Sequence, residues 1–363
     1  MSTVKTDIGG KRRSAALGLV TTTSLALLLL LVGGAWSSAL AAGPALWTTV
    51  PQQQPTPVGG ALGGLIELRP SQLLRSGTPT KVKIEEGAEP LANSAGLAFQ
   101  ANGSLWVCTL NNTVLKFTVA QLQNLAAVPH PAPAVTITST AFKFNIGCVL
   151  DAHGDLWVVD GTDDGVHEIS RAQLVAATVA GSTPQSITPA VTLTSTDLAS
   201  PAFATFDAAG NLWITSEGNN NIVEFQASDL GNPAATPHVV ISSPSVSGPG
   251  QPAFDAAGDL WVTNAVNNTV VKFTPAHLAA TGTPTADAII NDDGSGSLDV
   301  PWGCAFDSLG RLWVYNYGTA VSTTISMFGR GELAVSGSSS PTPKITLSRM
   351  APFAAQITFG PRY

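Results

Sequence analysis

Short runs of alternating apolar and polar residues, separated by Gly, Asn and Asp, cover most of this chain. The clearest run, residues 206–213, reads Phe-Asp-Ala-Ala-Gly-Asn-Leu-Trp, and residues 254–261 and 306–313 repeat it with few changes. Weaker copies lie at residues 99–106 and 150–157. An Asp that can bond the following backbone, with a Gly three residues later, is typical of a tight hairpin. Each copy of this Phe-Asp phrase therefore predicts a strand, a turn and a second strand.

A third and a fourth strand follow each phrase. The third alternates apolar and polar residues, as at residues 221–225, and leads into a short helical turn that ends in Leu. This Leu occurs six times, as Leu73, Leu122, Leu174, Leu230, Leu278 and Leu333. The short apolar fourth strand also occurs six times, at residues 82–84, 135–137, 191–193, 239–241, 288–290 and 345–347. Four strands per repeat, six times over, predict an all-β fold, a six-bladed β-propeller.

The last blade is divided between the two ends of the chain. Only five Phe-Asp phrases contain a Trp, and a sixth begins at residues 352–359, where the chain ends too early. Trp47 can supply the missing second strand, although it could also be an isolated aromatic residue. We therefore expect a single domain, residues 42–363, whose last blade is shared between residues 46–84 and 351–363. Pairing of the C-terminal strand with N-terminal strands would close the ring and remove exposed strand edges.

The N-terminal segment has the features of an export signal. Three basic residues at 11–13 precede an apolar stretch at 15–32, and Ala39-Leu40-Ala41 offers small residues at the positions that a signal peptidase reads. We expect a signal peptide of residues 1–41, a secreted or periplasmic domain and no stable membrane insertion after cleavage. The alternative is an N-terminal membrane anchor, because the apolar segment up to residue 42 is long enough to span a bilayer.

The composition of the chain excludes some classes of function. The chain has 363 residues, a net charge of −7, only 11% charged residues and 44% hydrophobic residues. The negative charge argues against a nucleic-acid partner, since neutralising phosphates needs the opposite sign. Three cysteines cannot form a disulfide framework. Cys108 and Cys148 could pair in an exported protein, or all three cysteines could be buried thiols. We expect a monomer.

The Phe-Asp phrase, followed by Asn-Asn-Thr-Val-Val-Lys-Phe at residues 267–273, resembles the repeat of NHL-type propellers and the related senescence-marker-protein/gluconolactonase group. The resemblance covers nearly the whole chain after the export signal. It implies a six-bladed propeller, and it specifies architecture better than activity, because such propellers include lactonases, lyases and non-catalytic binding proteins. The repeats here are longer than the NHL norm, and the extra residues lie between the third and fourth strands.

Polar residues follow the second strands, on the face opposite the Asp-x-x-Gly turns. Three residues after each internal Trp stands a short oxygen-bearing side chain: Thr109, Asp160, Ser216, Asn264 and Asn316. We expect these residues to surround the mouth of the central channel. The candidate metal or ligand site consists of Asp160, Glu217, Asn264 and Asn316. Further residues expected to line it are Asn145, Ser216, Trp302 and Tyr317.

Carboxylate and amide oxygens suit a hard cation such as Ca²⁺, and the resemblance to gluconolactonase implies a divalent cation at this mouth. The alternative is structural, because short polar residues at strand ends commonly satisfy backbone groups. Streptogramin lyase, another propeller of this kind, needs histidine and glutamate at the mouth. None of the five histidines is expected there, and no zinc site is expected.

Two hypotheses remain for the function. The first is a secreted propeller that serves as a binding or scaffolding module, with a small molecule or a protein at its polar mouth. The second is a metal-dependent lactonase or esterase of the gluconolactonase type, with Ca²⁺ as the cation. The residues leave open whether the protein is an enzyme and which ligand it takes.

Overall fold

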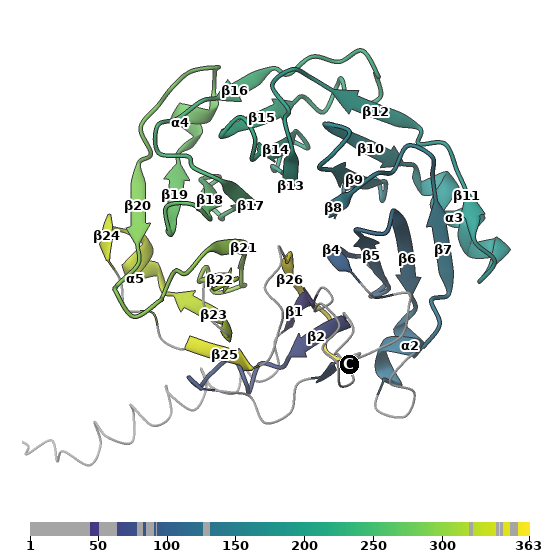
Figure 1. Ribbon diagram of the computed structural model, residues 1–363, viewed down its shortest axis with the longest axis horizontal. Coiled ribbons are helices and arrows are strands. Elements are labelled where there is room, and N and C mark those ends of the chain that lie inside the picture. Colours follow the sequence, from purple (N-terminus) through teal and green to yellow (C-terminus); the bar gives the residue numbers. More distant parts are fainter. Residues whose placement is uncertain are drawn as a thin grey trace, which may run out of the picture. The chain divides into compact units, whose positions relative to one another are not determined.

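Six β-sheets stand radially around a common centre in the computed structural model (Figure 1). They belong to one compact unit, Gly43–Tyr363. The structure describes residues 44–50, 64–77, 83–84, 91, 93–125, 131–318, 322–338, 341, 344–348 and 355–363, so the expected signal peptide lies outside the described residues. Within those ranges no helix is long and apolar enough to cross a membrane. The six-bladed β-propeller that the repeats predict is confirmed.

Each blade is an antiparallel sheet whose first strand lies nearest the centre (Figure 1). Blade 1 contains β4 (Ser94–Phe99), β5 (Leu105–Thr109), β6 (Thr113–Phe117) and β7 (Val135–Thr138). Blade 2 contains β8 (Asn145–Leu150), β9 (Leu156–Asp160), β10 (Gly165–Ile169) and β12 (Val191–Thr194). Blade 3 contains β13 (Pro201–Phe206), β14 (Leu212–Ser216), β15 (Asn221–Phe225) and β16 (Val239–Ile241). Blade 4 contains β17 (Pro249–Phe254), β18 (Leu260–Asn264), β19 (Thr269–Phe273) and β20 (Ala288–Asn291). Blade 5 contains β21 (Pro301–Phe306), β22 (Leu312–Asn316), β23 (Ser322–Phe328) and β25 (Lys344–Ser348).

The closing blade joins the two ends of the chain, as predicted. It consists of β26 (Ile357–Gly360), β1 (Ala45–Val50), β2 (Gly64–Leu68) and β3 (Lys83–Ile84), in that order from the centre. Trp47 lies opposite Thr358 in the antiparallel pair of β1 and β26, and its side chain is fully buried. The interpretation of Trp47 as part of the sixth repeat is therefore correct.

The Asp of the Phe-Asp phrase has two hydrogen-bonding roles. One oxygen of Asp255 accepts the N–H groups of Ala257 and Asp259, at 2.8 and 3.0 Å, and so holds the turn. The other oxygen accepts the indole N–H of Trp261 at 3.0 Å. Blades 2, 3 and 5 repeat the indole bond with Asp151, Asp207 and Asp307. The turn and the aromatic residue of the phrase are therefore linked by a single carboxylate.

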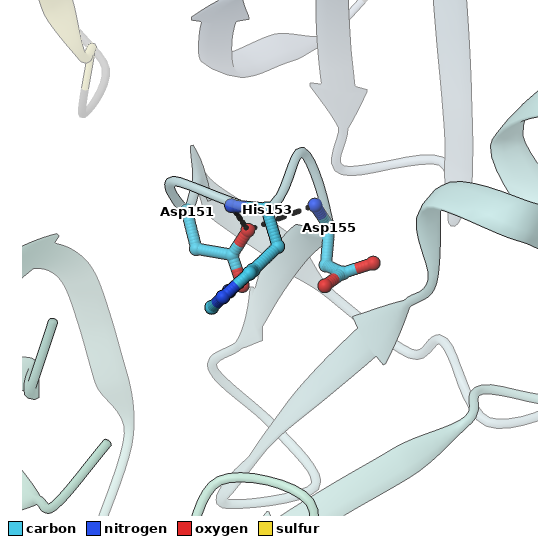
Figure 2. Close-up of side chains that lie close together, drawn as sticks. All are labelled: Asp151, His153 and Asp155. Atoms are coloured by element: carbon cyan, nitrogen blue, oxygen red, sulfur yellow. Dashed lines mark hydrogen bonds and ion pairs between the residues drawn. The ribbon is translucent and has the colours of Figure 1, made fainter.

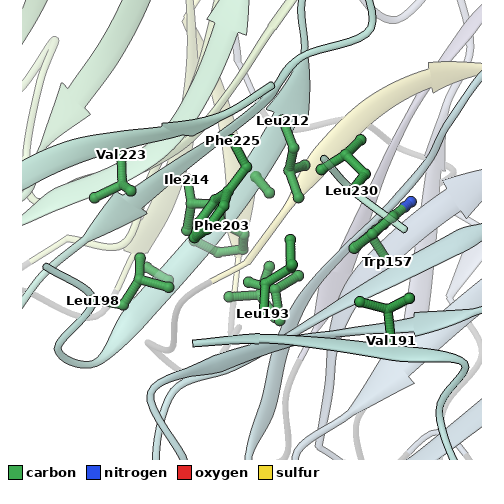
Figure 3. Packing of buried hydrophobic residues seen from close by; sticks show 14 of the residues in the cluster. Trp157, Val191, Leu193, Leu198, Phe203, Leu212, Ile214, Val223, Phe225 and Leu230 are labelled. Carbon is green, nitrogen blue, oxygen red and sulfur yellow. The ribbon is translucent and has the colours of Figure 1, made fainter. Parts of the chain in front are cut away.

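Each Trp also joins its blade to the next one. Trp213 meets Phe254 of blade 4 edge to face, with ring centroids 6.0 Å apart, and Trp261 meets Phe306 of blade 5 at 6.1 Å. Figure 3 shows the apolar core between blades 2 and 3, where Trp157, Leu193 and Phe203 pack together. The Phe and Trp of the phrase thus fill the wedge between neighbouring blades.

The predicted helical turns are present, and those at residues 275–278 and 330–333 end in the predicted leucine. The helices are α2 (Val119–Gln123), α3 (Arg171–Ala180), α4 (Pro275–Leu278) and α5 (Arg330–Leu333). All six predicted leucines are buried. Among the described residues only α3 extends beyond a short turn; it starts from a capping box formed by Ser170 and Gln173.

Two blades have a fifth strand that the sequence did not indicate. β11 (Gln185–Ser186) runs parallel to β7 of the preceding blade, and β24 (Gly337–Ser338) runs parallel to β20 of the preceding blade. Single parallel bridges from Gly282 to Ile241 and from Gly77 to Ile345 connect two further pairs of blades in the same way. The extra residues between third and fourth strands therefore cover the outer edge of the neighbouring sheet, where unpaired backbone groups would otherwise be exposed.

Candidate functional site

Polar residues at the ends of the second strands anchor the loops that precede the first strands. The side-chain oxygen of Asn264 accepts the N–H of Ser247 at 3.2 Å, and its nitrogen donates to the carbonyl of Ser245 at 2.7 Å. Asn316 makes the equivalent pair of bonds in blade 5, to Asp299 N–H at 3.3 Å and to the carbonyl of Ser297 at 3.1 Å. Each amide therefore ties a loop to the end of its own blade.

Asp160 and Ser216 have the same position in blades 2 and 3. The carboxylate of Asp160 accepts the N–H groups of Lys143 and Phe144 at 2.5 and 3.1 Å and that of Thr162 at 3.0 Å. The Ser216 hydroxyl accepts from Ala199 N–H at 2.8 Å and donates to the carbonyl of the same residue at 3.0 Å.

Thr109, the corresponding residue of blade 1, instead pairs with the Thr113 hydroxyl at 2.7 Å. The five side chains are fully buried. These bonds give Thr109, Asp160, Ser216, Asn264 and Asn316 a structural role. That the polar set also holds a cation stays a prediction.

Asn145 differs from these residues because its amide has no partner. It is the first residue of β8, it pairs with Asp160 in the strand register, and it is fully buried. Neither polar atom of its side chain has a hydrogen-bond partner among the described residues. An unpaired buried amide costs about 1–3 kcal/mol, so a group that supplies both a donor and an acceptor would bind favourably here.

The adjoining loop of blade 1 also lacks a contact that other blades make. Asn220 and Asn268, which turn the chain between second and third strands with positive φ, accept N–H groups from the next blade at 2.6 and 2.8 Å. Asn112 holds the same turn position with φ 64°, yet its buried oxygen has no partner within the described ranges. The mouth between blades 1 and 2 therefore contains unpaired polar groups at two places, the turn at Asn112 and the start of β8.

The remaining candidate residues lie further along the same face. Glu217 is about half buried, and burial raises the pKa of its carboxyl. Trp302 stands edge to face with Phe203 at 6.3 Å, and its carbonyl accepts the Thr263 hydroxyl at 2.9 Å. Tyr317 follows β22, and its N–H bonds the carbonyl of Val300 at 3.0 Å. The structure therefore gives Trp302 an aromatic partner, and burial accounts for the raised pKa of Glu217.

Two glutamines join the innermost strands at the centre of the ring. Gln251 of blade 4 accepts the N–H groups of Cys304 and Ile357 at 3.2 and 3.0 Å, which links blade 4 to blade 5 and to the closing blade. Gln356 of the closing blade accepts the N–H groups of Leu97 and Cys148, at 3.0 and 3.3 Å, in blades 1 and 2.

At the same strand position stand Phe203, which is fully buried, and three glycines. A Cβ on Gly96 or Gly147 would lie within 2.9 Å of the backbone of the next blade. The glycines at this position thus allow the inner strands to approach closely, and the larger residues fill the centre. The exposed fractions of Gln251 and Gln356 are only 7% and 5%, so the ring is filled at this level.

His167 lies nearer to the candidate site than the sequence suggested. It is buried in β10, as expected for a third strand, and its Nδ1 lies 3.0 Å from the hydroxyl of Thr192. Its Nε2, which has no hydrogen-bond partner among the described residues, stands 4.0 Å from a carboxylate oxygen of Asp160. Burial lowers the pKa of this imidazole, and the nearby carboxylate of Asp160 partly opposes that effect.

One cluster of possible metal ligands occurs in the turn of blade 2. Figure 2 shows Asp151, His153 and Asp155 close together, and their ligand atoms all lie within 4.8 Å of one another. Asp151 already accepts the N–H groups of His153 and Asp155, both at 2.9 Å, and the indole of Trp157 at 3.3 Å. The same turn recurs with Asp207, Asp255 and Asp307, so this cluster is one copy of a structural motif.

The three cysteines are buried free thiols. Burial raises the pKa of the Cys108 thiol, and a hydrogen bond with Cys148 adds to this rise. Cys108 and Cys148 are therefore neighbours, and the open question of a disulfide is resolved in favour of thiols.

Comparison with known proteins identifies the fold. No protein-family model matches the chain, and no curated protein matches it in sequence. Among solved structures, a protein of unknown function from Bacteroides caccae is 9% identical, with a TM-score of 0.57 over 88% of this chain and 100% of that one. A streptogramin B lyase is 12% identical, with a TM-score of 0.51 over 87% and 98% of the two chains. A putative gluconolactonase, 12% identical over 72% and 79%, has a TM-score of 0.46. At such identities the likeness concerns the fold alone, and at that level the resemblance expected from the repeats is confirmed.

Proposed function

We propose that this protein is an exported propeller that binds a ligand at the mouth between blades 1 and 2 without converting it. The observation that supports this most directly is the buried amide of Asn145, which lacks both a donor and an acceptor among the described residues. The ligand would carry an amide or a hydroxyl group, because such groups both donate and accept hydrogen bonds. Asn112 would add a second acceptor at the same mouth.

The hydrogen bonds of Asp160, Asn264 and Asn316 favour binding over cation-dependent hydrolysis. Their side-chain oxygens already accept backbone N–H groups, so a cation would have to replace those bonds. Glu217 supports the second hypothesis, a Ca²⁺-dependent lactonase. Its half-buried carboxyl has a raised pKa and would be the first candidate ligand for Ca²⁺.

A single set of experiments separates the two functions. The protein is titrated with D-glucono-1,5-lactone while the side-chain amide signal of Asn145 is followed by NMR, and hydrolysis is assayed with and without CaCl₂. We expect a saturable shift without turnover, lost in Asn145→Ala and kept in the control Asn264→Ala, which affects only a loop anchor. Turnover that requires Ca²⁺ and disappears in Glu217→Gln would contradict the proposal and establish the lactonase.

A further inference from the structure

A groove lies on the face opposite the candidate site, between residues 100–102 in the turn of blade 1 and the Asp-x-x-Gly turn of blade 2. Its volume is about 730 Å³. One wall is the helix α3, which packs beside β7 (Figure 1) and contributes Leu174, Val175 and Thr178. Val175 is 55% exposed, so the helix presents apolar surface to solvent here. Lys116 lies on the groove lining.

Blade 1 lacks the carboxylate that its neighbours place in this position. Gln100 replaces the Asp of the phrase, and the indole N–H of Trp106 has no partner among the described residues. The side-chain oxygen of Gln100 is also buried without a partner within the same ranges. Trp106 is fully buried, so its unpaired N–H is the exception among the phrases of blades 1 to 5.

Lys116 adds a positive charge that no carboxylate balances in the described part of the chain. Its ammonium lies 5.2 Å from the ring centroid of Trp106, and its one hydrogen bond there is to the Thr178 hydroxyl at 3.1 Å. Only 8% of the residue is exposed, and burial lowers its pKa. Ammonium groups have three donors and are costly to bury unpaired.

Blade 4 shows the same arrangement with its charges paired. Lys272 lies over Trp261 at 5.5 Å, as Lys116 lies over Trp106. Asp259 forms an ion pair with Lys272 at 3.1 Å, and Asp255 accepts the indole N–H. Blade 1 has Ser104 and Gln100 at the positions of these two carboxylates. The groove between blades 1 and 2 therefore keeps both donors of the motif and lacks both carboxylates.

We propose that this groove binds a small organic carboxylate. One oxygen of the ligand pairs with the Lys116 ammonium, and the other accepts the indole N–H of Trp106 after the side chain of Gln100 turns aside. The apolar body of the ligand lies against Leu174 and Val175 of α3. Asp151, also on the lining, is engaged by the indole of Trp157 and by its own turn.

Hexanoate is the probe, and hexanamide is its uncharged control. Binding is measured by calorimetry and by the indole N–H signal of Trp106, which Trp106→Phe identifies. We expect hexanoate to shift this signal and hexanamide to leave it unchanged. Lys116→Met should weaken hexanoate at least tenfold, because the charge-assisted bond is lost. Lys272→Met, the matched change in blade 4, should leave the affinity unchanged.

The variant Gln100→Asp distinguishes loss of the binding site from loss of the fold. It places a carboxylate where the ligand would bind, so it should abolish hexanoate binding while raising the melting temperature. Asn145→Ala should leave hexanoate binding intact, because that residue lies on the opposite face. Equal affinity for hexanoate and hexanamide, or hexanoate affinity unchanged in both Lys116→Met and Gln100→Asp, would overturn the proposal.

Discussion

At the scale of single residues, the carboxylate of the Phe-Asp phrase accounts for why Asp and Trp occur together. In Asp255 one oxygen holds the turn and the other holds the indole of Trp261. The ring of Trp261 in turn packs against Phe306 of the next blade. Loss of the carboxylate would therefore affect a turn, a buried donor and a contact between blades together.

Asp255→Ala tests this linkage. The variant removes two turn bonds and leaves the indole N–H of Trp261 buried without an acceptor, so we expect the free energy of unfolding to fall by about 2–4 kcal/mol. Urea titration followed by circular dichroism measures the change. Ser308→Ala, an exposed turn residue of blade 5, is the control and should stay within about 0.5 kcal/mol of the wild type. Equal stability of the two variants would contradict the linkage.

The buried imidazole of His167 predicts a pH dependence of stability. Burial lowers its folded-state pKa, so the unfolded chain takes up the proton more readily, and the stability it contributes is lost as the pH falls below about 6.5. Burial raises the pKa values of Glu217 and Glu224. Their contribution to the free energy of unfolding therefore changes with pH in the opposite direction.

The comparison is therefore made between wild type and His167→Gln, which can keep the bond to Thr192. We expect the melting temperature of the wild type to decrease more than that of the variant between pH 7.5 and pH 5. Parallel decreases in the two proteins would contradict the prediction, because they would show that His167 binds protons equally in the folded and unfolded chains.

At the scale of elements, the sequence identified the strands and turns well because each is encoded locally. The Asp-x-x-Gly turns, the alternating third strands and the six leucines lie where the patterns predicted them. The parallel strands β11 and β24 were not foreseen, since two residues paired to another blade leave no periodic pattern. Their only sign was the unusual length of the connections in which they lie.

The candidate site was harder to predict than the strands. The sequence placed Asn145, Asp160 and Asn264 at the ends of strands correctly, but the loop backbone that Asp160 and Asn264 bind could not be inferred from spacing. It also gave no reason to single out Lys116. The available signal was the weakness of the phrase at residues 99–106, where Gln100 stands in place of Asp.

At the scale of the whole molecule, the ring depends on β26. This strand pairs with β1, supplies Phe359 as the partner of Trp313 at 6.3 Å, and is followed by the Pro361 carbonyl that accepts the indole of Trp47 at 3.0 Å. The preceding Gln356 links blades 1 and 2. The last nine described residues, 355–363, therefore supply many of the contacts that close the ring.

Deletion of residues 355–363 should open the ring. The edge of β1 would lose its partner, and an unpaired strand edge invites association with other chains. We expect the truncated protein to unfold without a single cooperative transition and to associate in sedimentation velocity experiments. Tyr363→Phe, which loses only the hydroxyl bond to Gly103, is the control and should remain monomeric and folded. A truncated protein that stays monomeric with the wild-type melting temperature would contradict this role of β26.

The buried side chains of Phe203, Gln251 and Gln356 have a consequence for how molecules reach this protein. Because these side chains close the centre of the ring, a solute cannot pass through it. A molecule that binds on one face must dissociate from that same face. The two faces of the ring are then separate binding surfaces, and each can bind its own ligand. Nothing bound above needs to leave before something else is bound below.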